Sequence, residues 1–382
     1  MTVTRLLDHH DGAAELIELA VEIADAELAP RVDEYEAKAR FPRDQLTVLG
    51  KAGLLSLPYP EDLGGGGQPY EVYLQVLEEL SARWLSVGIS VSVHVLSCFP
   101  MVRFGTVAQQ QRWLPEMLGG TTIGAYCLSE PASGSDAAAL ATKATLDGES
   151  YSVTGTKAWI THGGAADFYN LMVRTSDDGP RGISCLLATP DTPGLSAAPP
   201  EHKMGANSSP TAQIILDAAR VPADQLIGAK GQGFAIALQA LDYGRLGIAA
   251  CAVGVAQAAL DAAITYAKQR HQFGKAIAEF QGMQFLLADM ATGVAASRAL
   301  YLEAARLADA GKPFGTAAAQ AKLFATDNAM RVTTDAIQVL GGAGYVRDYP
   351  VERYFREAKV LQIVEGTNQI QRMVIGRALT GV

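Results

Sequence analysis

The chain has 382 residues, of which 49% are hydrophobic and 19% charged, a balance that excludes a disordered protein and predicts two or three domains with sizeable cores. The formal net charge of −9, without a long run of Lys and Arg, argues against nucleic acid and anionic membrane surfaces as partners. The four cysteines are far apart and the six histidines form no cluster with metal-ligand spacing, so we expect reduced thiols and no metal site.

The N-terminal thirty residues are rich in Asp and Glu, which suits neither a signal peptide nor an acid-poor transit peptide. The most apolar run, residues 246–256, is too short to cross a bilayer. We therefore expect a cytoplasmic protein with no membrane partner.

Helical periodicity dominates the chain up to the pair Gly119-Gly120. Apolar residues recur on one face from residue 13 onward, and further helices are predicted at residues 45–53, 70–82 and 86–104. The last of these is rich in small and apolar residues, which is typical of a buried helix. Residues 1–119 are predicted to form an N-terminal helical domain.

After Gly120 the period of the apolar residues changes from 3.6 to 2, which indicates strands. A hairpin turn is predicted at Asp147-Gly148, and residues 120–229 are predicted to form an antiparallel sheet or barrel. The predicted strands are residues 123–127, 141–146, 151–159, 168–174, 183–188 and 213–216.

Long helical patterns return after Gly231, which predicts a four-helix bundle over residues 230–382. The predicted helices are residues 233–270, 279–310, 314–340 and 351–365, with a short one from residue 368. The predicted fold class is therefore mainly α with a β domain (α+β).

A carboxylate close to the C-terminus, Glu365, stands between an apolar helical run and Gly366. Thr367 is a natural N-cap, so Glu365 is predicted to lie at a corner between two helices. An acid at such a corner can face a pocket, and the first-turn amides of the next helix can face an electron-rich group there. The spacing alone is equally typical of a solvated glutamate at a helix junction.

Four other stretches place polar or flat side chains at the ends of elements. Residues 126–136 offer hydroxyls and backbone amides, and residues 155–164 bring Trp159 and Thr161 to a strand end. Residues 270–275 end a helix with basic groups, and residues 338–345 end another with three glycines. Taken singly, a polar loop, a core Trp or a charge that complements a helix dipole explains each of the first three.

Together these five stretches, in this order and with the helix, β, helix layout, resemble the acyl-CoA dehydrogenase family over nearly the whole chain. The resemblance implies an N-terminal helical domain, a middle β-barrel and a C-terminal four-helix bundle. It also implies FAD as the cofactor and a homotetramer built as a dimer of dimers.

The resemblance assigns site residues one by one. Glu365 matches the catalytic base, and Gly244 stands where some members carry the base on a helix instead, which leaves Glu365 in that role here. Residues implied to bind FAD are Leu128 and Ser129 at the ring edge, Trp159 beside the ring, Thr161 near N5, Thr367 and Gln369, and, toward the FAD of a neighbouring subunit, Arg270, Gln281, Gln338, Gly341 and Gly342. Residues implied to bind substrate are Ser135, Asp242, Arg245 and Gly366.

The implied reaction is the α,β-dehydrogenation of an acyl-CoA thioester to the trans-2-enoyl-CoA. Glu365 would abstract the α-proton while flavin N5 accepts hydride from the β-carbon, and electrons would pass to electron-transferring flavoprotein. A closed apolar pocket should raise the pKa of Glu365 toward the working pH.

Two details depart from the family pattern: Ala132-Ser133 in the flavin loop and Val364 before the base. Small residues near Ser92 leave room for short, medium or modestly branched acyl chains. Alternatives that stay open are an acyl-CoA oxidase-like or flavin monooxygenase-like enzyme, a dehydrogenase of carrier-protein thioesters, and a non-catalytic helical interaction protein.

Overall fold

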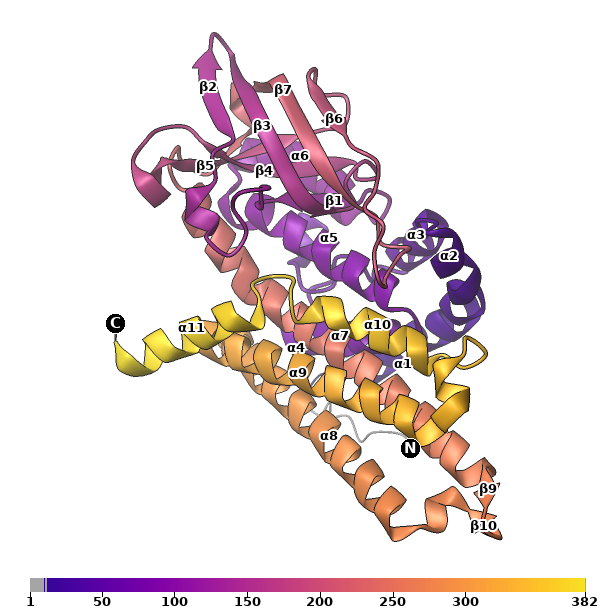
Figure 1. The fold of residues 1–382 in the computed structure, drawn as a ribbon. Coiled ribbons are helices and arrows are strands. Elements are labelled where there is room, and N and C mark those ends of the chain that lie inside the picture. The colour runs from indigo at the N-terminus through magenta and orange to yellow at the C-terminus, as the bar shows by residue number, and fades with distance from the viewer. Residues whose placement is uncertain (1–9, 11, 382) are drawn as a thin grey trace.

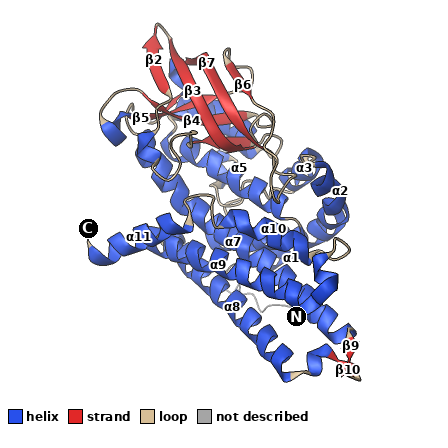
Figure 2. Cartoon of the chain, in the orientation of Figure 1, coloured by secondary structure: helices blue, strands red, loops and turns tan. Residues whose placement is uncertain are grey.

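The computed structural model describes residue 10 and residues 12–381, and it stacks a β domain on helices from both ends of the chain (Figure 1). Figure 2 shows the long strands gathered at one end of the molecule and helices filling most of the rest. Part of the acidic N-terminal pattern used above, residues 1–9 and 11, lies outside the described residues.

The N-terminal part is helical, as predicted. α5 is buried along almost its whole length because its sequence is apolar on every side, and α6 opens with a capping box between Thr106 and Gln109. The helices are α1 (Ala13–Ile23), α2 (Val32–Lys38), α3 (Arg43–Lys51), α4 (Tyr70–Arg83), α5 (Leu85–Phe104) and α6 (Val107–Leu118).

The β domain is one sheet in the order β6-β7-β3-β2-β4-β5-β8, with β1 paired to β4 outside this path. The expected hairpin between β2 and β3 turns at Asp147 and Gly148, where Gly148 has φ +62°. The strands are β1 (Gly124–Cys127), β2 (Lys143–Asp147), β3 (Ser150–Thr161), β4 (Phe168–Arg174), β5 (Ile183–Ala188), β6 (Leu195–Ala197), β7 (Thr211–Pro222) and β8 (Leu226–Ile227).

Two features of the sheet differ from the sequence prediction. β4 pairs in parallel with β1 and with β2, so the sheet is mixed and the expectation of a purely antiparallel sheet is wrong. The predicted barrel is not confirmed, since no strand pairing among the described residues joins β6 to β8. Parallel pairing joins segments distant in sequence, which period-2 alternation does not reveal.

The C-terminal part is a helical bundle in which α7 packs against α8, α9 and α10, and α9 packs against α8, α10 and α11. A two-stranded hairpin of β9 (His271–Gln272) and β10 (Lys275–Ala276) joins α7 to α8 at the far tip. The helices are α7 (Gly233–Gln269), α8 (Gln281–Asp309), α9 (Gly315–Leu340), α10 (Val351–Leu361) and α11 (Asn368–Thr380).

Within residues 12–381, three helices, α5, α7 and α8, are long and apolar enough to cross a membrane by length and composition alone, so the argument from the shortness of the run 246–256 does not hold. In the folded chain the most apolar window of α5 is entirely buried, and 72% of that of α7 is buried, against 33% for α8. The apolar surfaces of α5 and α7 therefore form a core shared by the N-terminal helices and the bundle.

Candidate active site

The corner that carries Glu365 has the predicted shape. α10 ends at Leu361, four residues earlier than predicted, and both Glu365 (φ +53°) and Gly366 (φ +89°) adopt left-handed backbone conformations. Thr367 caps α11, with its hydroxyl accepting a hydrogen bond from the Ile370 amide at 3.4 Å. A non-glycine residue in this conformation costs roughly 1–3 kcal/mol and persists only where surrounding contacts hold it.

The Glu365 carboxylate is buried, and neither of its oxygens has a hydrogen-bond partner among the described residues. The hydroxyl of Tyr126, at β1, is also buried without a partner. A Cβ at Gly244 on α7 would lie 2.0 Å from Glu365 Oε2, so a side chain at this position would force the carboxylate to move. The absence of a side chain at position 244 thus allows the Glu365 carboxylate to occupy its observed position.

Burial raises the pKa of Glu365 to about 7, although the positive charges of Lys322 and Arg245 oppose the rise. An ordinary glutamate is almost fully ionised at neutral pH, whereas a glutamate with a pKa of about 7 is about half protonated there. The rise agrees with the sequence expectation for a base in a closed pocket.

A cavity of about 170 Å³ is lined in part by Gly244, the residue next to the Glu365 carboxylate. Its volume is below the ~300–1,000 Å³ of pockets that hold drug-sized ligands, so it suits a small apolar group. The residues that line it include Tyr59, Tyr70, Leu96, Phe99, Tyr243 and Gly244.

The β domain presents a flat, exposed aromatic group beside the predicted flavin loop. Trp159 is 65% exposed and has φ +61° at an irregularity of β3. The Ala158 amide donates to the Ser129 carbonyl at 2.9 Å, which ties the Trp159 segment to Leu128 and Ser129. A large exposed tryptophan on a strained bulge gains nothing from core packing, so these residues fit the flat ring of FAD.

A buried ion pair shapes the same loop. The ammonium of Lys157 lies 2.7 Å from Glu130 and also donates to the Leu128 carbonyl at 3.2 Å. Glu130 accepts the amides of Ala141 and Thr142 at 2.7 and 3.0 Å. Hydrogen bonds to the buried Lys157–Glu130 pair thus hold the predicted flavin loop in place.

The predicted substrate residues lie on both sides of the corner. Arg245 is 6% exposed and pairs with Asp242 at 2.5 Å, and these two residues flank Gly244, the position on α7 that faces Glu365. Ser135 is exposed on the loop after β1, and Gly366 directly follows the base. Their roles toward substrate stay predictions.

Three more predicted FAD contacts lie on two separate elements. Thr161 ends β3, where it pairs with Thr211 of β7. Thr367 and Gln369 line a polar hollow of about 290 Å³ with Asp327 and Arg372.

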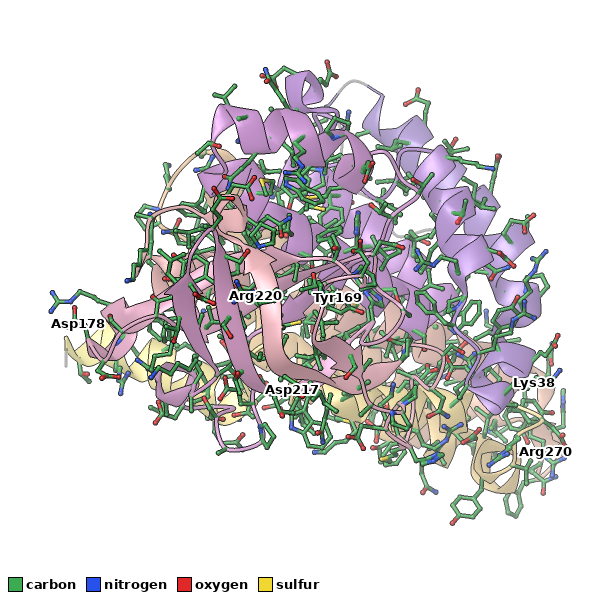
Figure 3. All side chains as sticks on the ribbon, turned by 90° about the horizontal axis from the view of Figure 1, so that it is seen from above. Lys38, Tyr169, Asp178, Asp217, Arg220 and Arg270 are labelled. Carbon is green, nitrogen blue, oxygen red and sulfur yellow. The ribbon has the colours of Figure 1, made fainter. Side chains whose placement is uncertain are left out.

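The remaining predicted FAD contacts lie elsewhere. Arg270, Gln281 and Gln338 are exposed, with Arg270 at the far tip of α7 (Figure 3). Gly341 and Gly342 are exposed beyond α9, and no atom of the chain lies within 4 Å of a Cβ built at either. Figure 1 shows the far tip of α7 at the opposite end of the molecule from the β domain, and the contact of these residues with the FAD of a neighbouring subunit stays a prediction.

Sequence reasoning missed several groups at the base. Lys322 of α9 donates to the Gly366 carbonyl, and the hydroxyl of Tyr70 on α4 donates to the Tyr243 carbonyl beside the cavity. A lysine within the alanine-rich α9 was the only sequence sign of the first, and it resembles a surface position. Tyr126 was included in a motif but given no role.

Comparison with known proteins identifies the family. Three family models match in order: the acyl-CoA dehydrogenase N-terminal domain over residues 11–121, the middle domain over 125–219 and the C-terminal domain over 231–380. An acyl-CoA dehydrogenase of Bacillus subtilis (strain 168) is 44% identical over 362 residues, which cover 94% of this chain and 96% of the relative.

Solved structures of related proteins support the same family. Butyryl-CoA dehydrogenase from Megasphaera elsdenii matches with a TM-score of 0.95 and 41% identity, covering 97% of this chain and 98% of that one. A chain in a structure reported for the electron transferring flavoprotein of Acidaminococcus fermentans matches with a TM-score of 0.96 and 43% identity, over the same shares of the two chains.

Proposed function

The chain belongs to the acyl-CoA dehydrogenase family of FAD-dependent oxidoreductases, and we propose that it removes the α-proton of an acyl-CoA thioester with Glu365 and forms the trans-2-enoyl-CoA. The observation that carries this proposal is the buried Glu365 carboxylate without a hydrogen-bond partner, in a left-handed corner beside an apolar cavity. A structural glutamate would be paired or solvated.

Each group around the base has a part in the proposed step. An α-proton of a thioester is weakly acidic, so its removal needs a carboxylate held within hydrogen-bond reach. With a pKa raised to about 7, Glu365 binds the proton more tightly than an ordinary glutamate does and still ionises near neutral pH. The aromatic walls around Tyr70 and Tyr243 exclude water from the proton transfer.

FAD would be held at its ring by Leu128, Ser129, Trp159 and Thr161, and near the corner by Thr367 and Gln369. Bound FAD supplies the hydride acceptor for the β-carbon. The left-handed bulge at Trp159 and the Glu130–Lys157 pair below the loop present these residues in a fixed arrangement.

The proposal extends to the acyl chain, the electron acceptor and the oligomeric state. We propose a short or modestly branched acyl chain, because the cavity is small and one relative is a butyryl-CoA dehydrogenase. Electron-transferring flavoprotein is the proposed electron acceptor, with support from the match to a chain in a structure reported for that protein. We further propose a cytoplasmic homotetramer, in which Arg270 and Gly342 complete the FAD site of a neighbouring copy.

The experiment is anaerobic reduction of the bound flavin by a panel of straight and branched acyl-CoAs, followed by absorbance. Wild-type protein should bleach fastest with chains of about four carbons. Glu365→Gln should keep its yellow colour and bind acyl-CoA, but bleach on the order of 10⁴-fold more slowly, since a positioned general base contributes roughly 10²–10⁴.

Normal bleaching by Glu365→Gln would refute Glu365 as the base. Rapid reoxidation by air after reduction would favour an oxidase. A colourless protein that takes up no FAD would support a non-catalytic role.

A further inference from the structure

A buried lysine lies under the corner that carries the base. Lys322, on α9, is completely buried, and its ammonium donates to the Gly366 carbonyl and to Asn368 Oδ1, both at 2.9 Å. Removing an ammonium from water is costly unless hydrogen bonds and charges compensate for it. Two neutral oxygens compensate only in part, and the negative charges of Glu365 and Asp327 supply the rest of the stabilisation.

We propose that Lys322 is a positioning residue for the base: its ammonium fixes the Gly366 carbonyl and so holds the strained corner, and its charge favours the ionised Glu365 carboxylate. This inference rests on the function proposed above. It assigns no contact with substrate or flavin to Lys322.

The corner needs such support because its backbone is left-handed at two successive residues. Gln371 donates to the Gly366 carbonyl at 2.9 Å and to the Glu365 carbonyl at 3.3 Å, so the Gly366 oxygen receives two donors. Asn368, which accepts from Lys322, in turn donates to Thr326 at 2.9 Å and Asp327 at 2.6 Å. The corner is thereby tied to two successive turns of α9.

The charges around the carboxylate give Lys322 a second effect. The groups that interact with Glu365 from the surrounding elements are Tyr70 and Tyr73 of α4, Tyr126 of β1, Arg245 and Cys251 of α7, and Lys322 of α9. Burial raises the pKa of each tyrosine and of Cys251, so these groups stay neutral at pH 7.

Two of these groups are cations, and they differ in how far their charge is balanced. Arg245 is paired with Asp242 at 2.5 Å, whereas Lys322 has only neutral oxygens as hydrogen-bond acceptors. Burial lowers the pKa of Lys322 to about 8, so it is still protonated at pH 7. The Asp327 carboxylate also acts on Lys322 through its charge, but no carboxylate among the described residues accepts a hydrogen bond from the Lys322 ammonium, in contrast to Arg245.

The test compares Lys322→Gln, which keeps a hydrogen-bond donor without the charge, with Lys322→Met, which keeps neither. Without the charge, Glu365 ionises at higher pH, so the acidic limb of kcat/KM for flavin reduction should move up by about one pH unit in both variants, a roughly tenfold loss at pH 6. Lys322→Met should lose additional activity at every pH because the corner loosens.

The matched control is Thr326→Val, which breaks a hydrogen bond of the same network to Asn368 but leaves the charge. It should lower the unfolding temperature without moving the acidic limb. An unmoved limb in Lys322→Gln, with activity reduced equally at all pH values, would show that Lys322 only holds the fold and would overturn the inference.

A second readout does not depend on turnover. Infrared difference titration should detect the Glu365 carboxyl band, identified by its loss in Glu365→Gln, with a midpoint about one unit higher in Lys322→Gln. An equal midpoint in both proteins would overturn the inference even if Lys322→Met fails to fold. Absence of bleaching in the wild-type protein with every acyl-CoA would instead refute the proposed function, and the titration would still test the effect of Lys322.

Discussion

The Glu365 corner and the tip of the bundle around Arg270 are both expected to serve catalysis. They differ in how many residues of the same chain surround them. Around Glu365, groups from α4, α7, α9 and β1 converge on one buried carboxylate within a single chain. Arg270 is exposed, and a Cβ built at Gly342 meets no atom of the described residues within 4 Å apart from its chain neighbours. The base site is therefore formed by the monomer, whereas the tip gains its expected role only against a second molecule.

Among changes that leave Glu365 itself in place, the largest effect on the rate should follow from a side chain added next to the Glu365 carboxylate. Gly244→Ala places a methyl group 2.0 Å from Glu365 Oε2, so the carboxylate must move. A displacement of about 1 Å can cost roughly 10²-fold in rate, which stopped-flow flavin reduction would measure. Gly376→Ala, on α11 with no atom within 4 Å of the added group, is the control and should leave the rate unchanged. Equal rates in the two variants would contradict the tight fit at Glu365.

A large loss of stability is expected from Lys157→Met. Removing one partner of a buried ion pair leaves Glu130 uncompensated and costs about 3–5 kcal/mol, measurable by urea denaturation. Lys143→Met, on an exposed site of β2, should change the free energy of unfolding by less than about 0.5 kcal/mol. A Lys157→Met protein of wild-type stability and FAD affinity would show that the pair does not support the flavin loop.

The pH dependence of kcat/KM should report the base. The active form is the carboxylate, so the rate should rise with pH through about 7 and level off above it. At pH 5.5 only about 3% of the group is ionised, so the rate should fall roughly 30-fold below the plateau. A flat profile between pH 5.5 and 8 would contradict a raised pKa for Glu365.

The smallest effect on the stability of the chain should come from a substitution at the tip of the bundle. Arg270→Ala should leave the unfolding midpoint of the isolated chain unchanged, because Arg270 is exposed at the end of α7. If it contacts the FAD of a neighbour, FAD should bind about tenfold more weakly, since tenfold corresponds to about 1.4 kcal/mol, a typical loss for one charged hydrogen bond.

Absorbance after gel filtration measures the FAD that Arg270→Ala retains, and light scattering measures the oligomer. Lys268→Ala, exposed on the same helix end, is the matched control. Unaltered FAD retention in Arg270→Ala would show that Arg270 does not bind the FAD of a neighbouring subunit.

The sequence predicted the parts of the fold that depend on local pattern. Long periodic helices such as α7 and α9, and the turn at Gly148, were placed within a few residues. Strands of two or three residues, such as β6 and β8, carry too few residues to show alternation. The parallel pairing of β1 with β4 depends on contacts between distant segments.

The same division holds within the candidate site. The corner was predictable because Gly366 and the Thr367 cap are neighbours of Glu365 in the sequence. Lys322 reaches this corner from 44 residues away, and Tyr70 from a different domain, so no spacing rule places them there. The far tip was recognised only by resemblance.

The unpaired Glu365 carboxylate makes the stability of the folded protein depend on pH. Its pKa rises from 4.5 to about 7 on folding, so the native chain binds this proton more tightly than the unfolded chain does. Its contribution to stability is therefore fully present below pH 4.5 and is lost as the pH rises through about 7, by roughly 3 kcal/mol in total. At pH 8, Glu365→Gln should be more stable than the wild-type protein, so the group proposed for catalysis is also one that weakens the apoprotein.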